Sequence, residues 1–179
     1  MSETLEQSLQ SIFCQIDPSY EVIVIDDGST DNSLEILYKL QDVYPTLRVI
    51  PLVRDSRRKL GETRNVSIRA ARGEFVLLHI DADDIWGPFI PAFIQVYHEI
   101  SRRLGLNNFF LSGRQIQMSP RRLLLEYPYR NIYYGEDRVL WNDLMVAGKI
   151  HFLNHTTFRT RIPLSTPAKR LWKMFSSIY

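Results

Sequence analysis

The stretch EFVLLHIDADDIWGP, residues 74–88, joins an apolar run to a cluster of acids. Asp81, Asp83 and Asp84 lie within four positions at the end of that run. Carboxylates about 4 Å apart repel by roughly 4 kcal/mol at an effective dielectric of 20, so the fold gains nothing from crowding them. A divalent cation removes this repulsion, and Mg²⁺ or Mn²⁺ is commonly held by one or two carboxylates. The stretch therefore predicts a buried strand that ends at a functional site.

The composition is that of a globular protein. A chain of 179 residues with 45% apolar residues can bury one sizeable core, and its net charge of +2 is too small to indicate nucleic-acid binding. No apolar run approaches the roughly 18 residues of a membrane span, and no basic region precedes an apolar one at the N-terminus. Cys14 is the single cysteine, which excludes an internal disulfide. We expect one domain over residues 1–179 and a cytoplasmic location.

Helical and extended patterns alternate along the chain. A helix begins near Thr4, where Thr4 and Gln7 have the spacing of a capping box. The predicted strands cover 21–26, 47–53, 74–80 and 107–113, and the predicted helices 31–44, 62–72 and 91–105. Gly73 would end the second of these helices and Gly105 the third. This order predicts an α/β fold with a largely parallel sheet and helices on its faces.

Two of the predicted strands end in acids. VIVIDDGS places Asp26 and Asp27 at the end of one, and LLHIDADD places the three later aspartates at the end of another. Ligands bind at the carboxyl ends of the strands in such sheets. One acidic strand end is as readily explained by a cap or a turn. Two clusters at one edge favour a bound cation.

Three motifs in this order resemble a known family. YEVIVIDDGSTDNSLEIL, GETRNVSIRAARGEFVLLHIDADDIWGP and YYGEDRVLWNDLM together resemble a family 2 glycosyltransferase with the GT-A fold, over residues 4–162. The resemblance implies a Rossmann-like sheet and inverting transfer of a sugar from a nucleotide sugar. It also implies a UDP-sugar as the most common donor, a carbohydrate or lipid-linked acceptor, and Mn²⁺ or Mg²⁺.

The resemblance assigns nucleotide and metal contacts to individual residues. Asp27, the second acid of DDGS, would contact the base of the nucleotide, whereas Asp26 would shape the turn. Arg64 of ETRN would lie near the nucleotide and its phosphates, and its alternative is an exposed helix arginine. Asp83 would bind the metal that bridges the diphosphate, while Asp81 would reach the ribose or the waters of the metal.

The remaining acids have other implied roles. An inverting transfer needs a general base for the acceptor hydroxyl, and in the resemblance this is an acid of the ED pair. We favour Asp137 as the base, with Glu136 as its rival. From the residues alone, the pair would be the acidic first turn of a helix. Asp84 is expected to cap a helix, and Trp86 either walls the sugar or acceptor or packs in the core.

Two features depart from the family pattern. Family members open with a strand similar to VSVVIPTYN before the helix that begins here near Thr4, and this chain starts at Met1. The departure indicates a truncated chain or a domain without activity. Members also end with a YRxH element whose histidine approaches the metal, and Arg161 of FRTRI stands at that position. His151 and His155 lie nearby, and an ordinary packing role is favoured for both.

The tail and the alternative functions complete the sequence-based expectations. Residues 163–179 are basic and aromatic, which suits an interfacial helix at an anionic membrane or a helix docked on a protein surface. A haloacid-dehalogenase-like phosphatase also ends a strand in DxD. It leaves DDGSTDNS and ETRN unexplained, and Ile85 stands where that class expects Thr or Val. A non-catalytic nucleotide-sugar-binding module is the third hypothesis.

Overall fold

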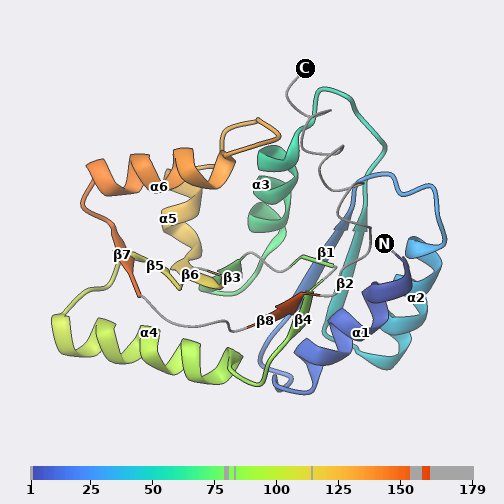
Figure 1. The fold of residues 1–179 in the computed structure, drawn as a ribbon, viewed down its shortest axis with the longest axis horizontal. Helices are drawn as coiled ribbons and strands as arrows, with labels where there is room; N and C mark the ends of the chain where they lie inside the picture. The colour runs from blue at the N-terminus through green and yellow to red at the C-terminus, as the bar shows by residue number, and fades with distance from the viewer. Residues whose placement is uncertain (1, 79–80, 83, 114, 154–158, 162–179) are drawn as a thin grey trace.

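The structure, a computed structural model, describes residues 2–78, 81–82, 84–113, 115–153 and 159–161. Helices and strands follow one another along the chain as Figure 1 shows. The helices are α1 (Ser2–Phe13), α2 (Ser33–Val43), α3 (Leu60–Ala70), α4 (Ile90–Leu104), α5 (Arg121–Glu126) and α6 (Glu136–Val146). The strands are β1 (Val22–Asp26), β2 (Leu47–Pro51), β3 (Phe75–Leu78), β4 (Asp84–Trp86), β5 (Phe110–Ser112), β6 (Gln117–Pro120), β7 (Ile150–Phe152) and β8 (Arg159–Arg161).

The strands form three hydrogen-bonded groups. β1 pairs with β2 in parallel, four strands follow the order β3-β6-β5-β7, and β4 pairs with β8. β6 runs antiparallel to both its neighbours, whereas β5 and β7 are parallel. The α/β prediction is confirmed. The strand directions are more mixed than simple alternation indicates, because β5 and β6 form a hairpin closed by a 2.8 Å bond from the Gly113 N–H to the Ile116 carbonyl.

Two apolar layers lie on opposite sides of β3. Phe75 and Leu77 belong to the core that α1, α2 and α4 cover, whereas Val76 and Leu78 belong to the core under α3, α5 and α6. This alternation is what the period of two along a strand requires. The two sets of helices lie on opposite sides of the strands in Figure 1. The apolar run 75–78 therefore reads as a strand covered on both faces.

Three predicted helix ends are wrong. α1 begins at Ser2, so Thr4 lies inside the helix and is not its cap. Asp84 is the first residue of β4 and is fully buried, while α4 begins six residues later with Phe89 as its cap residue. α3 ends at Ala70, before the predicted stop at Gly73. The predicted end of α4 is confirmed, because Gly105 follows it with a φ of 64° in the left-handed region.

β1 and β3 are less buried than their apolar sequences predict. The residues of β1 before Asp26 and those of β3 before Leu78 are only partly buried, whereas β5 and β6 are buried throughout. In the described part of the chain, β1 pairs only with β2 and β3 only with β6. The two strands nevertheless begin close together, because Glu21 Oε1 accepts the Gly73 N–H at 3.1 Å. One edge of each strand is therefore left without a strand partner among the described residues.

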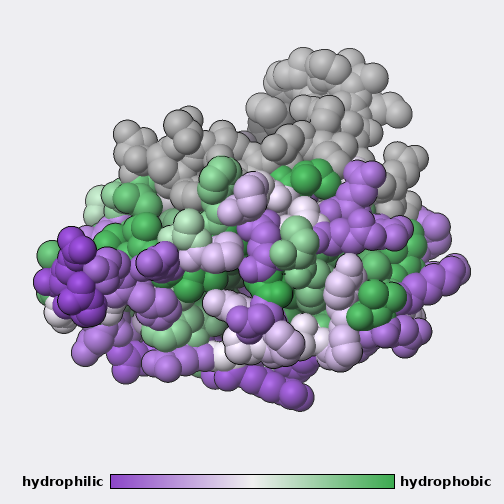
Figure 2. All heavy atoms as spheres, turned by 90° about the horizontal axis from the view of Figure 1, so that it is seen from below, coloured by the Kyte–Doolittle hydropathy of each residue, from purple (hydrophilic) through white to green (hydrophobic). Residues whose placement is uncertain are grey.

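The face of the molecule that carries α1 and α4 is mostly polar at its margins. Hydrophilic side chains follow the lower rim and both ends of this face, and apolar side chains lie scattered between them (Figure 2). The apolar side of α4 faces inward, where Ile90, Phe93 and Tyr97 are buried. In the ranges described above, none of the helices combines the length and the apolar character that crossing a membrane requires.

Candidate active site

α3 lies directly against the segment that leads into α6. A Cβ atom at Gly61 would meet the Arg130 carbonyl oxygen at 1.9 Å, and the Gly61 N–H donates to the Ile132 carbonyl at 3.2 Å. One turn later, the Asn65 amide donates to the Tyr129 carbonyl at 2.8 Å and accepts the Tyr129 N–H at 2.9 Å. Asn65 is buried, so these bonds are shielded from water. The start of α6 is thereby fixed relative to α3.

Arg64 and Glu136 form an ion pair across this contact. The Arg64 Nη2 and Glu136 Oε1 atoms are 3.3 Å apart, and the Glu136 side chain is 5% exposed. The guanidinium also lies 5.5 Å from the centre of the Tyr129 ring. Burial raises the pKa of Glu136; the Arg64 charge opposes this rise, whereas Asp137 and Asp81 add to it. The Asp81 carboxylate of the second motif therefore lies close enough to the third motif to raise the pKa of Glu136.

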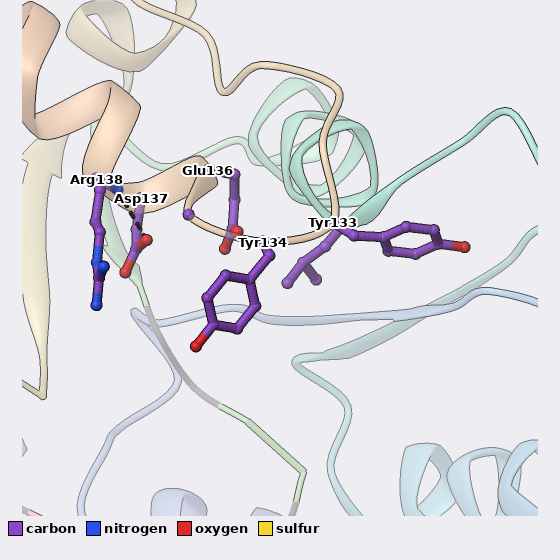
Figure 3. Close-up of a pocket in the computed structure, with 7 residues that line it drawn as sticks. Tyr133, Tyr134, Glu136, Asp137 and Arg138 are labelled. Atoms are coloured by element: carbon purple, nitrogen blue, oxygen red, sulfur yellow. Dashed lines mark hydrogen bonds between the residues drawn. The ribbon is translucent and has the colours of Figure 1, made fainter. Parts of the chain in front are cut away.

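A pocket of about 230 Å³ opens at the start of α6. Figure 3 shows Tyr134, Asp137 and Arg138 pointing to the same side, with Tyr133 turned away from them. The Asp137 Oδ1 accepts the backbone N–H of Arg138 at 2.8 Å. Asp137 is half-buried, so its carboxylate remains accessible from the pocket. The residues that line the pocket are Leu60, Tyr133, Tyr134, Gly135, Glu136, Asp137 and Arg138.

Asp27 is tied to the loop before α3 and to α3 itself. Its Oδ1 accepts a 3.0 Å bond from Arg58 Nε, and its Oδ2 accepts a 3.0 Å bond from the Thr63 hydroxyl. The Arg58 hydrogen bond, more than the one from Thr63, holds the pKa of Asp27 below its ordinary value. Asp27 is therefore bonded to Thr63 of α3, which is the residue directly before Arg64.

The turn after β1 has the geometry expected of Asp26. Its Oδ2 accepts the Ser29 N–H at 3.2 Å, as the predicted turn role requires. Gly28 has a φ of 73°, and a Cβ atom there would lie 2.7 Å from the Arg54 Cβ. Glycine is needed at this position both for the backbone conformation and for the close approach.

A polar stripe on α1 holds the turn that follows β3. The Thr4 hydroxyl donates to the Ala82 carbonyl at 3.0 Å, and the Ser8 hydroxyl donates to the Asp81 carbonyl at 3.4 Å. Thr4 and Ser8 are both buried. The acidic turn is therefore positioned by backbone contacts from a helix more than 70 residues away. The stripe consists of Thr4, Ser8 and Ser11. Ser11 accepts the Trp86 N–H, and Gln15, in the turn after α1, bonds to the backbone of Trp86 and Ile90.

The metal assignment falls partly outside the structure. Asp83 and His155 are not among the described residues, and the described ones contain no group of three His, Cys, Asp or Glu side chains arranged to hold a metal. Asp81 is described; it lies three residues after the end of β3 and is half-buried. His151 packs edge-on against Phe109, with ring centres 5.4 Å apart, which agrees with a packing role.

Two further expectations have structural outcomes. Trp86 is 3% exposed and belongs to the core shared by α1 and α4, so of its two predicted roles the structure supports packing. The backbone of Arg161 pairs with Asp84 across β4 and β8. The tail 163–179 and its predicted membrane contact lie outside the described residues.

Sequence reasoning missed the residues that hold the site together. Asn65 was noted only as part of ETRN, yet its side chain bonds both backbone groups of Tyr129. The spacing of Thr4, Ser8 and Ser11, which places hydroxyls on one helical face, was a readable signal for a buried polar contact. No local signal could indicate that Arg64 meets Glu136, because 72 positions separate them.

Related proteins match part of the chain. The poly(ribitol-phosphate) beta-glucosyltransferase of Bacillus spizizenii is 37% identical over 87 residues, which are 48% of this chain and 13% of that protein. Glycosyltransferase GlyG of Streptococcus pneumoniae is 35% identical over 83 residues, which are 45% of this chain and 26% of that protein. The chain thus spans only a minor part of the length of these relatives.

Solved structures share the fold over nearly the whole chain. Residues 1–349 of S. aureus TarS, in complex with UDP, align with a TM-score of 0.70 at 20% identity, covering 90% of this chain and 57% of that one. The mannosyltransferase PcManGT of Pyrobaculum calidifontis, in complex with GDP-Man and Mn²⁺, aligns with a TM-score of 0.72 at 17% identity, covering 97% and 57%. These neighbours are GT-A glycosyltransferases, so the predicted GT-A fold is confirmed.

The family assignment rests on a match over most of the chain. The family described as glycosyl transferase family 2 matches residues 2–150, which include all three motifs and the contacts among them. This match also removes the phosphatase alternative. The chain belongs to glycosyl transferase family 2.

Proposed function

We propose that this chain transfers a sugar from a nucleotide sugar, a UDP-sugar, to a carbohydrate or lipid-linked acceptor with inversion at the sugar carbon. The observation that carries the proposal is the convergence of three motifs on α3. Thr63 donates a hydrogen bond to Asp27 of the first motif, and Arg64 forms an ion pair with Glu136 of the third. The charge of Asp81, from the second motif, contributes to the raised pKa of Glu136. UDP is named for the TarS structure and supports this choice of donor, and Mn²⁺ is named for the PcManGT structure, which holds GDP-Man, and supports a divalent metal.

The donor site is proposed to lie along Asp27, Arg64 and Asp81. A carboxylate has about four acceptor positions, so Asp27 can accept a base N–H while it keeps Arg58 and Thr63. Arg64 would lie beside the diphosphate and hold Glu136 at the same time. Asp81, together with Asp83, would hold Mn²⁺ or Mg²⁺, which when bound offsets the charge of the leaving diphosphate.

Asp137 is proposed as the general base. A base must reach within about 2.6–3.2 Å of the acceptor hydroxyl. Asp137 is half-buried at the pocket, whereas Glu136 is almost fully buried and ion-paired with Arg64. Asp137 would take the proton of the hydroxyl as its oxygen attacks the sugar carbon and the nucleoside diphosphate leaves from the opposite face. Glu136 would hold Arg64 in place, and Arg64 would in turn position the diphosphate of the donor.

The test combines donor binding with turnover. With UDP at about 100 times its dissociation constant and Mn²⁺ present, we expect thermal stabilisation equivalent to about 2.7 kcal/mol. Asp137→Asn should lower sugar transfer by about 10²–10⁴-fold and leave UDP binding unchanged. Glu136→Gln is the matched comparison and should reduce transfer less. Full transfer by Asp137→Asn, with an inactive Glu136→Gln, would reassign the base to Glu136.

A nucleotide-sugar-binding module without turnover is the second candidate. It is favoured by the partly exposed β1, whose end carries Asp26 and Asp27 and whose outer edge has no strand partner among the described residues. This candidate requires UDP-dependent stabilisation together with no release of UDP from UDP-sugars over several hours. Release of UDP that depends on Asp137 excludes it.

A further inference from the structure

Arg138 stands where the dipole of α6 disfavours a cation, because it lies in the first turn of that helix. The side chain is exposed, and among the described residues its guanidinium has no ion pair or hydrogen bond. The neighbouring acids are engaged in other ways, since Glu136 pairs with Arg64 and Asp137 accepts the backbone N–H of Arg138. An unneutralised guanidinium thus stands at the pocket beside the proposed base.

Tyr134 is the second unusual residue at this pocket. Tyr134 is 68% exposed, although its ring is large and largely apolar. Figure 3 shows the ring on the same side as the Asp137 carboxylate and the Arg138 guanidinium. Tyr133 differs, because it points away and carries the Lys59 ammonium 4.5 Å above its ring. Tyr134 therefore offers a flat apolar face to whatever enters the pocket.

From these two residues we propose that the pocket at the start of α6 is an acceptor subsite for a sugar or polyol that carries an anionic group, either phosphate or carboxylate. The inference rests on the proposed transferase function. The Tyr134 ring packs against the C–H face of the acceptor, as aromatic rings do with flat apolar surfaces. The planar fork of Arg138 binds the anionic group, a geometry that suits phosphate and carboxylate alike. Asp137 lies between them and faces the hydroxyl that reacts.

The charges at the pocket make this assignment specific. Asp137 repels an anion, so the anionic group must lie on the Arg138 side and the reacting hydroxyl on the Asp137 side. Glu136 adds little repulsion because Arg64 lies 3.3 Å from it. The pocket has a volume of about 230 Å³ and opens to solvent, so one sugar-sized unit can occupy it while the rest of a longer acceptor extends outside it.

The test measures binding of three probes to the intact chain with UDP and Mn²⁺ present. Glucose 6-phosphate and glucuronate carry the two kinds of anion, and glucose is the neutral control. By saturation-transfer NMR titration, at least one of the two anions should bind the parent protein about tenfold more tightly than glucose, as expected for hydrogen bonds to a charged group. A preference for only one of the two anions identifies the group that the subsite takes.

Two variants separate the two contacts. Arg138→Gln should abolish the preference for the anions and leave glucose binding unchanged. Tyr134→Ala should weaken all probes by a similar factor and keep the preference. The matched controls are Arg103→Gln on α4 and Tyr38→Ala on α2, both exposed and on other helices, and they should bind as the parent does.

The outcomes distinguish this inference from the proposed function. If the anion preference survives in Arg138→Gln, or if the parent shows none, the subsite assignment is wrong even when UDP and Mn²⁺ bind. If UDP fails to bind, the transferase proposal is wrong. The titration without nucleotide then still decides the subsite, because neither Arg138 nor Tyr134 is placed at the nucleotide.

Discussion

Replacing Arg64 with glutamine would remove the cation next to the buried Glu136 carboxylate. At 3.3 Å, the two charges attract by roughly 5 kcal/mol at an effective dielectric of 20. Breaking a buried pair by removing one partner typically costs about 3–5 kcal/mol. Because the Arg64 side chain is 18% exposed and Glu136 can take up a proton, we expect Arg64→Gln to lower the free energy of unfolding by about 2–3 kcal/mol at pH 8.

The same loss should depend on pH in a defined direction. Burial already raises the pKa of Glu136 in the folded protein, and removal of Arg64 raises it further. The folded variant then binds a proton that the unfolded chain has released, so its stability increases as the pH falls through the folded pKa. The difference in unfolding free energy between the parent and Arg64→Gln should therefore be smaller at pH 5 than at pH 8.

A double-mutant cycle in urea isolates the interaction. Arg64→Gln, Glu136→Gln and the double variant are unfolded at both pH values, and the coupling energy at pH 8 should be about 1 kcal/mol or more. The exposed pair Arg69 and Glu62 serves as the control, since its side chains are 53% and 34% exposed and such pairs contribute about 0.2–1 kcal/mol. Strictly additive losses for Arg64 and Glu136, or a difference that ignores pH, would refute the role of this ion pair.

Three further predictions concern the supports of the site. Gly61→Ala should lower the free energy of unfolding, measured in urea, by about 2 kcal/mol or more, because the new Cβ would meet a backbone carbonyl oxygen at 1.9 Å. Gly148→Ala is the control and should cost less, because a Cβ there meets no atom within 4 Å. Equal losses in the two variants would contradict the close approach at Gly61. Asp27→Asn should reduce stability at pH 7 and progressively less on acidification. The lowered pKa of Asp27 stabilises the folded state at pH values above the ordinary pKa of aspartate, and this contribution is lost as the pH falls through the folded pKa. Thermal melts from pH 7 to pH 3 should show the melting temperatures of the two proteins converging. Thr4→Val should cost about 1 kcal/mol and weaken Mn²⁺-dependent UDP binding, and unchanged binding would show that the Ala82 contact does not support the acidic turn.

The order of elements was predictable because its signals are local. The apolar run 75–78 and the run 21–26 show the period of a covered strand, and the helix that ends at Gly105 carries its own stop signal. Asp84 was misassigned for the opposite reason. Asp84 begins β4, which pairs with β8 more than 70 positions later in the chain. No sequence pattern near residue 84 indicates that pairing.

The site was predictable in its acids and not in its supports. Asp27, Glu136 and Asp137 stand out as acids at strand ends or at a helix start, and the structure brings the first two to α3 through Thr63 and Arg64. Asn65 has no such signal, because its partner is the backbone of Tyr129, and every residue type has the same backbone groups. A single sequence therefore does not reveal which distant backbone groups a side chain of the site will bond.

The edges of β1 and β3 that have no strand partner among the described residues affect how the chain behaves at high concentration. Each presents a row of backbone N–H and C=O groups, and neither Val22–Ile25 nor Phe75–Leu78 contains the lysine or proline that commonly protects an edge strand from self-association. Copies of this chain that meet along these edges can extend one another's sheets, a route to aggregates that grows with protein concentration. Refolding yield should accordingly fall as the chain concentration rises, and a short peptide of strand-forming sequence should compete for the same edge.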